Sequence, residues 1–221
     1  MDLYQDLEIY WAGLLSPFQP SKEVSDQLFS QLVKTYNEEG RHYHTIDHIE
    51  KLVHLADHYS DIIQKKTIVG FSILYHDIVY RPGMGDNEEL SAERAEVSLN
   101  KLNVPPATIE EVKEFIITTK FHHSGEVTDP DLKYFLDFDL SILAAPREEY
   151  MQYVKNVRKE FAHLSDAHFA WGRRSFLQSI LAKPFIYFTS EFRRLESDAR
   201  ENMNWEISEV SVKMNRANFT S

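Results

Sequence analysis

The chain has 221 residues, no cysteine and a formal net charge of −11. The lack of cysteine excludes disulfides, thiolate metal ligands and a cysteine nucleophile. The negative charge disfavours binding to a nucleic-acid polymer, because such binding depends on neutralising phosphates with cationic side chains. A small phosphorylated substrate is compatible with this charge, since a metal ion and a few Lys or Arg side chains can reverse the local field.

Glycine and proline are scarce, with 7 and 8 copies, and the segments between them are long and periodic. This pattern predicts an all-α protein, and the length suits one domain over residues 1–221 with N- and C-terminal helical extensions. No signal peptide is expected, because the first residues have neither a basic region nor an apolar run. The longest apolar stretch, around Ile68 to Tyr80, is too short and too polar to span a bilayer. We therefore expect a cytoplasmic protein that does not bind membranes.

Apolar side chains recur at helical spacing along nearly the whole chain. The predicted helices cover residues from about 3–15, 22–39, 46–63, 66–79, 86–102, 108–120, 130–144, 146–161, 166–182 and 190–213. The segment over 66–79 is apolar nearly all round, which is typical of a helix at the centre of a bundle. Asp129 followed by Pro130 predicts a cap and a first-turn proline for the helix that starts there.

One aspartate falls on the buried face of the helix predicted over 130–144. That face is defined by four leucines, namely Leu132, Leu136, Leu140 and Leu143. At 100° per residue, Asp139 lies beside this stripe and Asp137 lies well off it. An inward aspartate needs a partner, which can be a metal ion, a helix N-terminus or an arginine.

Two further helices carry polar groups on apolar faces. His48 lies one turn before Leu52, and the adjacent pair His76-Asp77 lies in the most apolar predicted helix. A core histidine bonded to a carbonyl would explain such a pair alone. Together with Asp139, however, three helices each offer an inward ligand, which is how helical bundles build metal sites.

The ligand set of His48, His76, Asp77 and Asp139 contains two imidazoles and two carboxylates. It suits Mn²⁺, Fe²⁺, Co²⁺, Ni²⁺ or Zn²⁺, with Mg²⁺ also compatible. On an octahedral ion it would leave two positions for water and a substrate oxygen. Such an ion acidifies its water and polarises a phosphoryl group.

The order His, His-Asp, Asp resembles the H…HD…D signature of the HD superfamily of metal-dependent phosphohydrolases. The surrounding segments sharpen the resemblance to one bacterial branch, the predicted metal-dependent HD superfamily phosphohydrolases, from about residue 5 to 210. These segments are RHYHTIDHIEKL, LYHDIVY, DNEELSAERA, ITTKFHH, DFDLSILAAP, VRKEFAHL and ENMNWEI. The resemblance implies an HD-domain-like helical bundle that hydrolyses a phosphoester or phosphoanhydride of a small substrate, a nucleotide above all, by a metal-activated water.

Within this resemblance, His44 and His48 are both candidates for the first ligand. His48 is preferred because the apolar pattern IEKLV follows it, as it follows the first histidine of HD proteins. His44 would then contact the substrate. The resemblance also makes Glu88 the candidate general base, with an ordinary first-turn glutamate as the alternative, and gives Asp77 a catalytic role besides ligation.

Cationic and aromatic residues near these ligands are candidates for substrate binding. Arg41 and Tyr43 can bind phosphate oxygens, although a loop arginine can equally lie in solvent. Lys120, His122 and His123 end a predicted helix, where they can grip phosphate or protonate a leaving group. They can equally be a solvated helix C-terminus that is favoured by the helix dipole.

Two other functions remain open. The domain can be a catalytically weak, nucleotide-binding sensor, or a di-iron HD-type oxygenase in which His122 or His123 bridges to a second ion. The presence of all four ligands weighs against the sensor. The sequence leaves the oligomeric state open, with a homodimer as one option.

Overall fold

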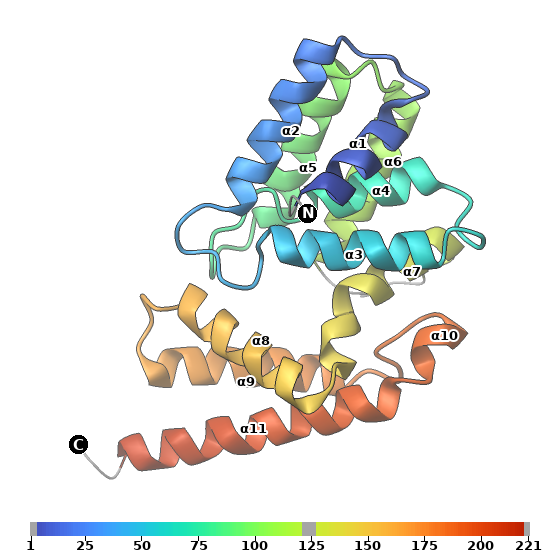
Figure 1. Ribbon diagram of the computed structural model, residues 1–221. Coiled ribbons are helices and arrows are strands. Elements are labelled where there is room, and N and C mark those ends of the chain that lie inside the picture. Colours follow the sequence, from blue (N-terminus) through green and yellow to red (C-terminus); the bar gives the residue numbers. More distant parts are fainter. Residues whose placement is uncertain (1–3, 121–126, 219–221) are drawn as a thin grey trace. The chain divides into compact units, whose positions relative to one another are not determined.

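The computed structural model describes residues 4–120 and 127–218, which form eleven α-helices and one short 3₁₀ helix, with no strand among them (Figure 1). The helices are α1 (Gln5–Leu15), α2 (Lys22–Tyr36), α3 (Ile46–His58), α4 (Lys66–Tyr75), α5 (Asn87–Lys101), α6 (Pro106–Thr119), α7 (Pro130–Leu140), η1 (Ser141–Ala144), α8 (Arg147–Glu160), α9 (Asp166–Leu181), α10 (Ser190–Arg193) and α11 (Glu196–Asn218). The prediction of an all-α fold is confirmed. None of the described helices has both the length and the apolar character that crossing a membrane requires.

The chain divides into two compact units, Met1–Phe138 and Asp139–Ser221. The boundary falls inside the last turn of α7. The expectation of one domain with helical extensions stays a prediction, because two compact units can belong to one domain. The more specific expectation of an HD-type bundle also stays a prediction.

Helix α4 forms the centre of the first unit, as its apolar sequence predicts. Every residue from Ile68 to Tyr75 is buried, and the helix packs against α1, α3, α5 and α6 (Figure 1). Gly70 lies close against α1, because a Cβ there would lie 2.6 Å from a methyl carbon of Leu14. A larger residue at this position would therefore require the side chains of Leu14 and Tyr10 to shift.

Helix α4 ends earlier than predicted, at Tyr75, so His76 and Asp77 lie in the turn that follows it. The N–H of Ile78 donates to the carbonyl of Tyr75, three residues back, so the helical bond pattern tightens and ends here. The Tyr36 hydroxyl donates to the carbonyl of Leu74, at 3.1 Å. This early stop places two polar residues at the C-terminal end of the most buried helix.

The starts of two other helices involve a proline and an asparagine that the predicted ranges did not single out. Helix α6 begins at Pro106 rather than at Thr108, because a proline at the first helical position lacks only an N–H that the helix would leave unpaired. At the start of α5 it is Asn87 that fixes the preceding loop. Its side-chain oxygen accepts the N–H of Arg81 and its amide donates to the same residue's carbonyl.

The start of α7 confirms the predicted cap. One carboxylate oxygen of Asp129 accepts the backbone N–H groups of Asp131 and Leu132, at 2.8 and 3.1 Å. Asp131 is itself buried, and its carboxylate accepts the N–H groups of Gln64 and Lys65 ahead of α4. Two aspartates two residues apart therefore join the beginnings of α7 and α4.

Replacement of Asp131 by alanine should destabilise the first unit by about 1–3 kcal/mol, because the N–H groups of Gln64 and Lys65 both lose their bond to a buried carboxylate. Denaturant unfolding measures this difference. The exposed Glu93 of α5 provides the control, and its replacement by alanine should change stability by less than about 0.5 kcal/mol. Equal stabilities of the two variants would contradict the capping role of Asp131.

The buried face of α7 is wider than the leucine stripe predicted. Asp137 is fully buried, with no exposed surface, whereas Asp139 is only half-buried. The prediction that Asp137 lies off the buried face is therefore wrong. Tyr134, Phe135 and Phe138 are buried too, so nearly the whole circumference of α7 is covered. In addition, the α-helix ends at Leu140, and Leu143 belongs to the 3₁₀ helix, where a rotation of 100° per residue no longer applies.

The second unit packs α9 against α11, with η1 in contact with α8 and α11. A buried ion pair lies in its core. The Arg173 guanidinium donates to both carboxylate oxygens of Glu206, at 2.7 and 3.1 Å. The Tyr150 hydroxyl donates to the same carboxylate at 2.6 Å. The ring of Tyr153 lies under the guanidinium, 5.0 Å from its carbon to the ring centroid.

Lys183, just after α9, should make the stability of the second unit depend on pH. Burial lowers the pKa of its ammonium from 10.5 to about 8. Between these two values the unfolded chain binds more protons than the folded one, so this group adds stability as the pH rises from about 8 to 10.5. Lys183→Met should therefore be more stable than the wild type at pH 7, and the difference should shrink toward pH 10. Unfolding of both proteins across this range measures it; a constant difference would contradict the effect.

Candidate metal centre

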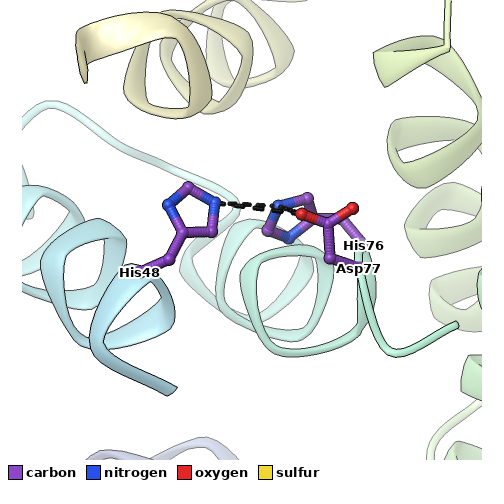
Figure 2. A group of neighbouring side chains, drawn as sticks. All are labelled: His48, His76 and Asp77. Atoms are coloured by element: carbon purple, nitrogen blue, oxygen red, sulfur yellow. Dashed lines mark hydrogen bonds and ion pairs between the residues drawn. The ribbon is translucent and has the colours of Figure 1, made fainter. Parts of the chain in front are cut away.

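Two buried imidazoles face each other in the first unit. His48 lies in the first turn of α3 and His76 directly follows α4, with 4% and 2% of their surfaces exposed. Their Nε2 atoms are 3.3 Å apart (Figure 2). His48 is held there because its neighbours Ile46 and Ile49 are buried on the same helix. The two histidines are 28 residues apart in sequence, and the packing of α3 on α4 brings them together.

A carboxylate completes the group. Oδ2 of Asp77 lies 3.1 Å from Nε2 of His76 and 4.0 Å from Nε2 of His48. One ligand atom from each of the three residues lies within 4.8 Å of the others, so the group could hold a metal ion. The side chain of Asp77 is 20% exposed, in contrast to the two imidazoles. The group therefore has buried nitrogen donors and an oxygen donor nearer to solvent.

The hydrogen bonding of His76 fits metal binding. Its Nδ1 lies 2.9 Å from the carbonyl oxygen of Ile73. A carbonyl can only accept, so Nδ1 carries a proton, and in the neutral form of the ring Nε2 presents a lone pair toward His48 and Asp77. Histidines that ligate metals commonly donate their second N–H to a carbonyl in this way, which fixes the tautomer and the ring plane.

The spacing of the donor atoms also fits a divalent ion. Metal–nitrogen bonds of about 2.1 Å place neighbouring ligand atoms about 3.0–3.4 Å apart. The separations of 3.3 Å for His48–His76 and 3.1 Å for His76–Asp77 fall in this range, whereas the 4.0 Å between His48 and Asp77 is nearer to the separation of about 4.2 Å expected of two ligands on opposite sides of an ion. The C-terminal end of α4 adds the negative pole of a helix dipole, which favours a cation at this end. Donors, spacing and field all suit a bound cation.

His44 lies next to this group but outside it. Its Nε2 is 4.0 Å from Oδ2 of Asp77, and its ring stacks on that of Tyr80 with centroids 4.0 Å apart. The ring of Tyr43 contacts both His44 and His48, with centroids 4.9 and 5.0 Å apart. This geometry favours His48 as the first ligand and leaves His44 and Tyr43 in position to contact a substrate; both roles remain predictions.

Arg41 binds backbone carbonyls beside this group. Nη1 donates to the carbonyls of His44 and Asp77, at 2.9 Å each, and Nη2 donates to that of Ile78, at 3.0 Å. The predicted contact of Arg41 with phosphate stays a prediction. These three hydrogen bonds join the loop before α3 to the turn after α4.

The candidate general base lies near Asp77 and Lys120. Burial raises the pKa of the Glu88 carboxyl, the negative charge of Asp77 raises it further, and Lys120 opposes the shift. The Lys120 ammonium forms an ion pair with Glu89, the next residue along α5. Sequence patterns point to Glu88 and Lys120, but they gave no sign that Glu89 is the partner of the lysine.

Three further predicted residues lie outside the described part of the first unit. His122 and His123 lie outside the described residues. Asp139 is half-buried in the second unit, so its role as a fourth ligand stays a prediction from the sequence.

A scan against protein-family models, a search of curated proteins and a search of solved structures found no match to this chain. The HD resemblance therefore rests on the motifs of the sequence, and the metal-binding potential rests on the three-residue group.

Proposed function

We propose that this protein is a metal-dependent phosphohydrolase that cleaves a phosphoester or phosphoanhydride bond of a small substrate, with a nucleotide as the favoured class. The observation that carries the proposal is the group of His48, His76 and Asp77, whose donor atoms have the spacing of ligands around one ion. The resemblance of the surrounding motifs to HD phosphohydrolases supplies the reaction class.

The three ligands would hold a divalent ion such as Mn²⁺, Fe²⁺, Co²⁺, Ni²⁺, Zn²⁺ or Mg²⁺. Such an ion would lower the pKa of a coordinated water and polarise a phosphoryl oxygen. Glu88 is assigned the role of general base, because a carboxyl whose pKa is raised by burial accepts a proton more readily. Lys120 would balance the negative charge of the substrate, in exchange for its ion pair with Glu89.

The partly exposed rings of Tyr43 and His44 would contact the rest of the substrate. A flat, uncharged group can pack against such rings without a specific hydrogen-bond pattern. This arrangement supports a nucleotide over a simple alkyl phosphate. The expected cytoplasmic location stays a prediction.

A metal-by-substrate screen tests the proposal. Protein stripped with a chelator is reloaded with each of the six ions and assayed on p-nitrophenyl phosphate and on nucleoside mono- and triphosphates. His48→Ala should lose turnover with every ion, while His54→Ala, at an exposed position of the same helix, should keep it. Turnover that survives His48→Ala would contradict the proposal.

Other outcomes of this screen select other functions. Tight nucleotide binding without turnover under all six ions would indicate a sensor, and two irons per chain would indicate an oxygenase. Asp139→Asn, assayed in the same way, tests the fourth ligand that the sequence predicts; unchanged metal affinity would remove it from the ligand set.

A further inference from the structure

We infer that Arg41 is a positioning residue of the metal centre, which fixes the loop leading to His48 in register with the turn that carries His76 and Asp77. This inference rests on the proposed metal-dependent function. It gives Arg41 a role distinct from binding phosphate, and it does not depend on which substrate is cleaved.

The bonds of the guanidinium carry the inference. It reaches the carbonyl of His44 on one segment and the carbonyls of Asp77 and Ile78 on the other, at 2.9, 2.9 and 3.0 Å. Three of the five N–H groups of an arginine are thereby used on backbone oxygens. The two segments lie more than 30 residues apart in sequence, so no local turn sets their register.

Aromatic rings hold the guanidinium in place. Its carbon lies 5.1 Å from the ring centroid of Tyr36 and 5.6 Å from that of Tyr80. Tyr80 also stacks on His44, and Tyr36 donates to the carbonyl of Leu74. Both rings are thus tied to one of the two segments that Arg41 joins. The two rings therefore add cation–π contacts to the hydrogen bonds of the guanidinium.

The consequence for the metal centre follows from the chain path. His48 lies four residues after His44, and its Nε2 must approach both His76 and Asp77 for the three donors to converge. Arg41 bonds to the carbonyl of Asp77, so these bonds fix the backbone of a ligand without occupying its carboxylate. Its positive charge also satisfies carbonyls at the negative end of α4. A lysine would keep the charge but cannot present a planar fork to three carbonyls.

The test compares the full-length Arg41→Lys and Arg41→Gln variants with wild type. Arg81→Lys is the matched control, because Arg81 is exposed near the same turn and its guanidinium pairs with the exposed Asp86 at 2.6 Å. Co²⁺ is titrated into chelator-treated protein, with the dissociation constant and the visible absorption of the bound ion as readouts. Circular dichroism and the unfolding midpoint without metal report the fold.

Both Arg41 variants should bind Co²⁺ about 10–100-fold more weakly, as is typical when the support of a metal ligand is lost. The absorption of the bound ion should change as well, and Arg81→Lys should match wild type. Wild-type protein that binds neither Co²⁺ nor any of the other five ions would overturn the proposed function itself. Wild-type binding with an equal constant and spectrum in the Arg41 variants would overturn this inference alone.

Two further results would also overturn the inference. One is a raised KM for a phosphorylated substrate with unchanged Co²⁺ affinity, which would make Arg41 a substrate-binding residue. The other is loss of the fold in both Arg41 variants, which would assign the arginine to the stability of the whole unit. Weakened Co²⁺ binding in folded variants is the result that supports it.

Discussion

Replacement of His76 by alanine is expected to abolish metal-dependent activity and to weaken metal binding by more than about 100-fold. Loss of a direct ligand should exceed the 10–100-fold cost of losing a residue that only supports one. His76 is the member of the group nearest to both others, with Nε2 at 3.3 Å from His48 and 3.1 Å from Asp77. Its removal leaves only His48 and Asp77 of the three donors, and two donors hold a divalent ion weakly.

Thermal unfolding with and without metal gives a readout independent of activity. An ion that binds only the folded protein stabilises it by about 2.7 kcal/mol at 100 times its dissociation constant. Wild-type protein should gain this stability on addition of Co²⁺, and His76→Ala should gain none. The control is His58→Ala, an exposed position at the end of α3, which should behave as wild type. Equal metal-induced stabilisation of His76→Ala and wild type would contradict the ligand assignment.

Replacement of Glu206 by alanine is expected to destabilise the second unit by about 3–5 kcal/mol, because it leaves a buried guanidinium without its carboxylate. Glu206 is 1% exposed and accepts bonds from Arg173 and from the Tyr150 hydroxyl. Loss of the charged partner of Arg173, rather than loss of side-chain volume, should account for most of the change in the free energy of unfolding. Urea unfolding monitored by circular dichroism measures the change.

Two variants separate the ion pair from other effects at this position. Glu209→Ala, at an exposed position of the same helix, should change stability by less than about 0.5 kcal/mol. The double variant Arg173→Met/Glu206→Leu should recover much of the loss, because apolar residues of similar volume often replace a buried ion pair at little cost. A Glu206→Ala protein as stable as the Glu209→Ala control would contradict the account of this core.

The helices of this protein were predictable because their apolar residues recur with the period of a helix, and the all-α class followed from that. Helix ends were less predictable where tertiary bonds decide them. At the end of α4 the carbonyl of Leu74 accepts the Tyr36 hydroxyl, a contact between segments 38 residues apart that no local pattern announces. Asp137 was misplaced for a similar reason, since a helix covered on nearly all sides has no single buried stripe.

The candidate site also combines features that local sequence patterns predict with features that depend on contacts between distant segments. A histidine next to an aspartate at the end of an apolar helix is a local pattern, and so is a histidine at the edge of an apolar face; both pointed to metal ligands. No local pattern distinguishes an arginine that binds phosphate from one that binds carbonyls. The role of Arg41 therefore emerged only when His44, Asp77 and Ile78 were seen around one guanidinium.

The central claim is that His48, His76 and Asp77 hold a catalytic divalent ion. Its most direct test is the metal content of reconstituted, dialysed protein by elemental analysis, with turnover of a phosphorylated substrate measured on the same samples. We expect about one ion per wild-type chain with metal-dependent turnover, and neither in the His76→Ala/Asp77→Ala variant. Wild-type protein that retains no ion, or a double variant that retains both ion and turnover, would contradict the claim.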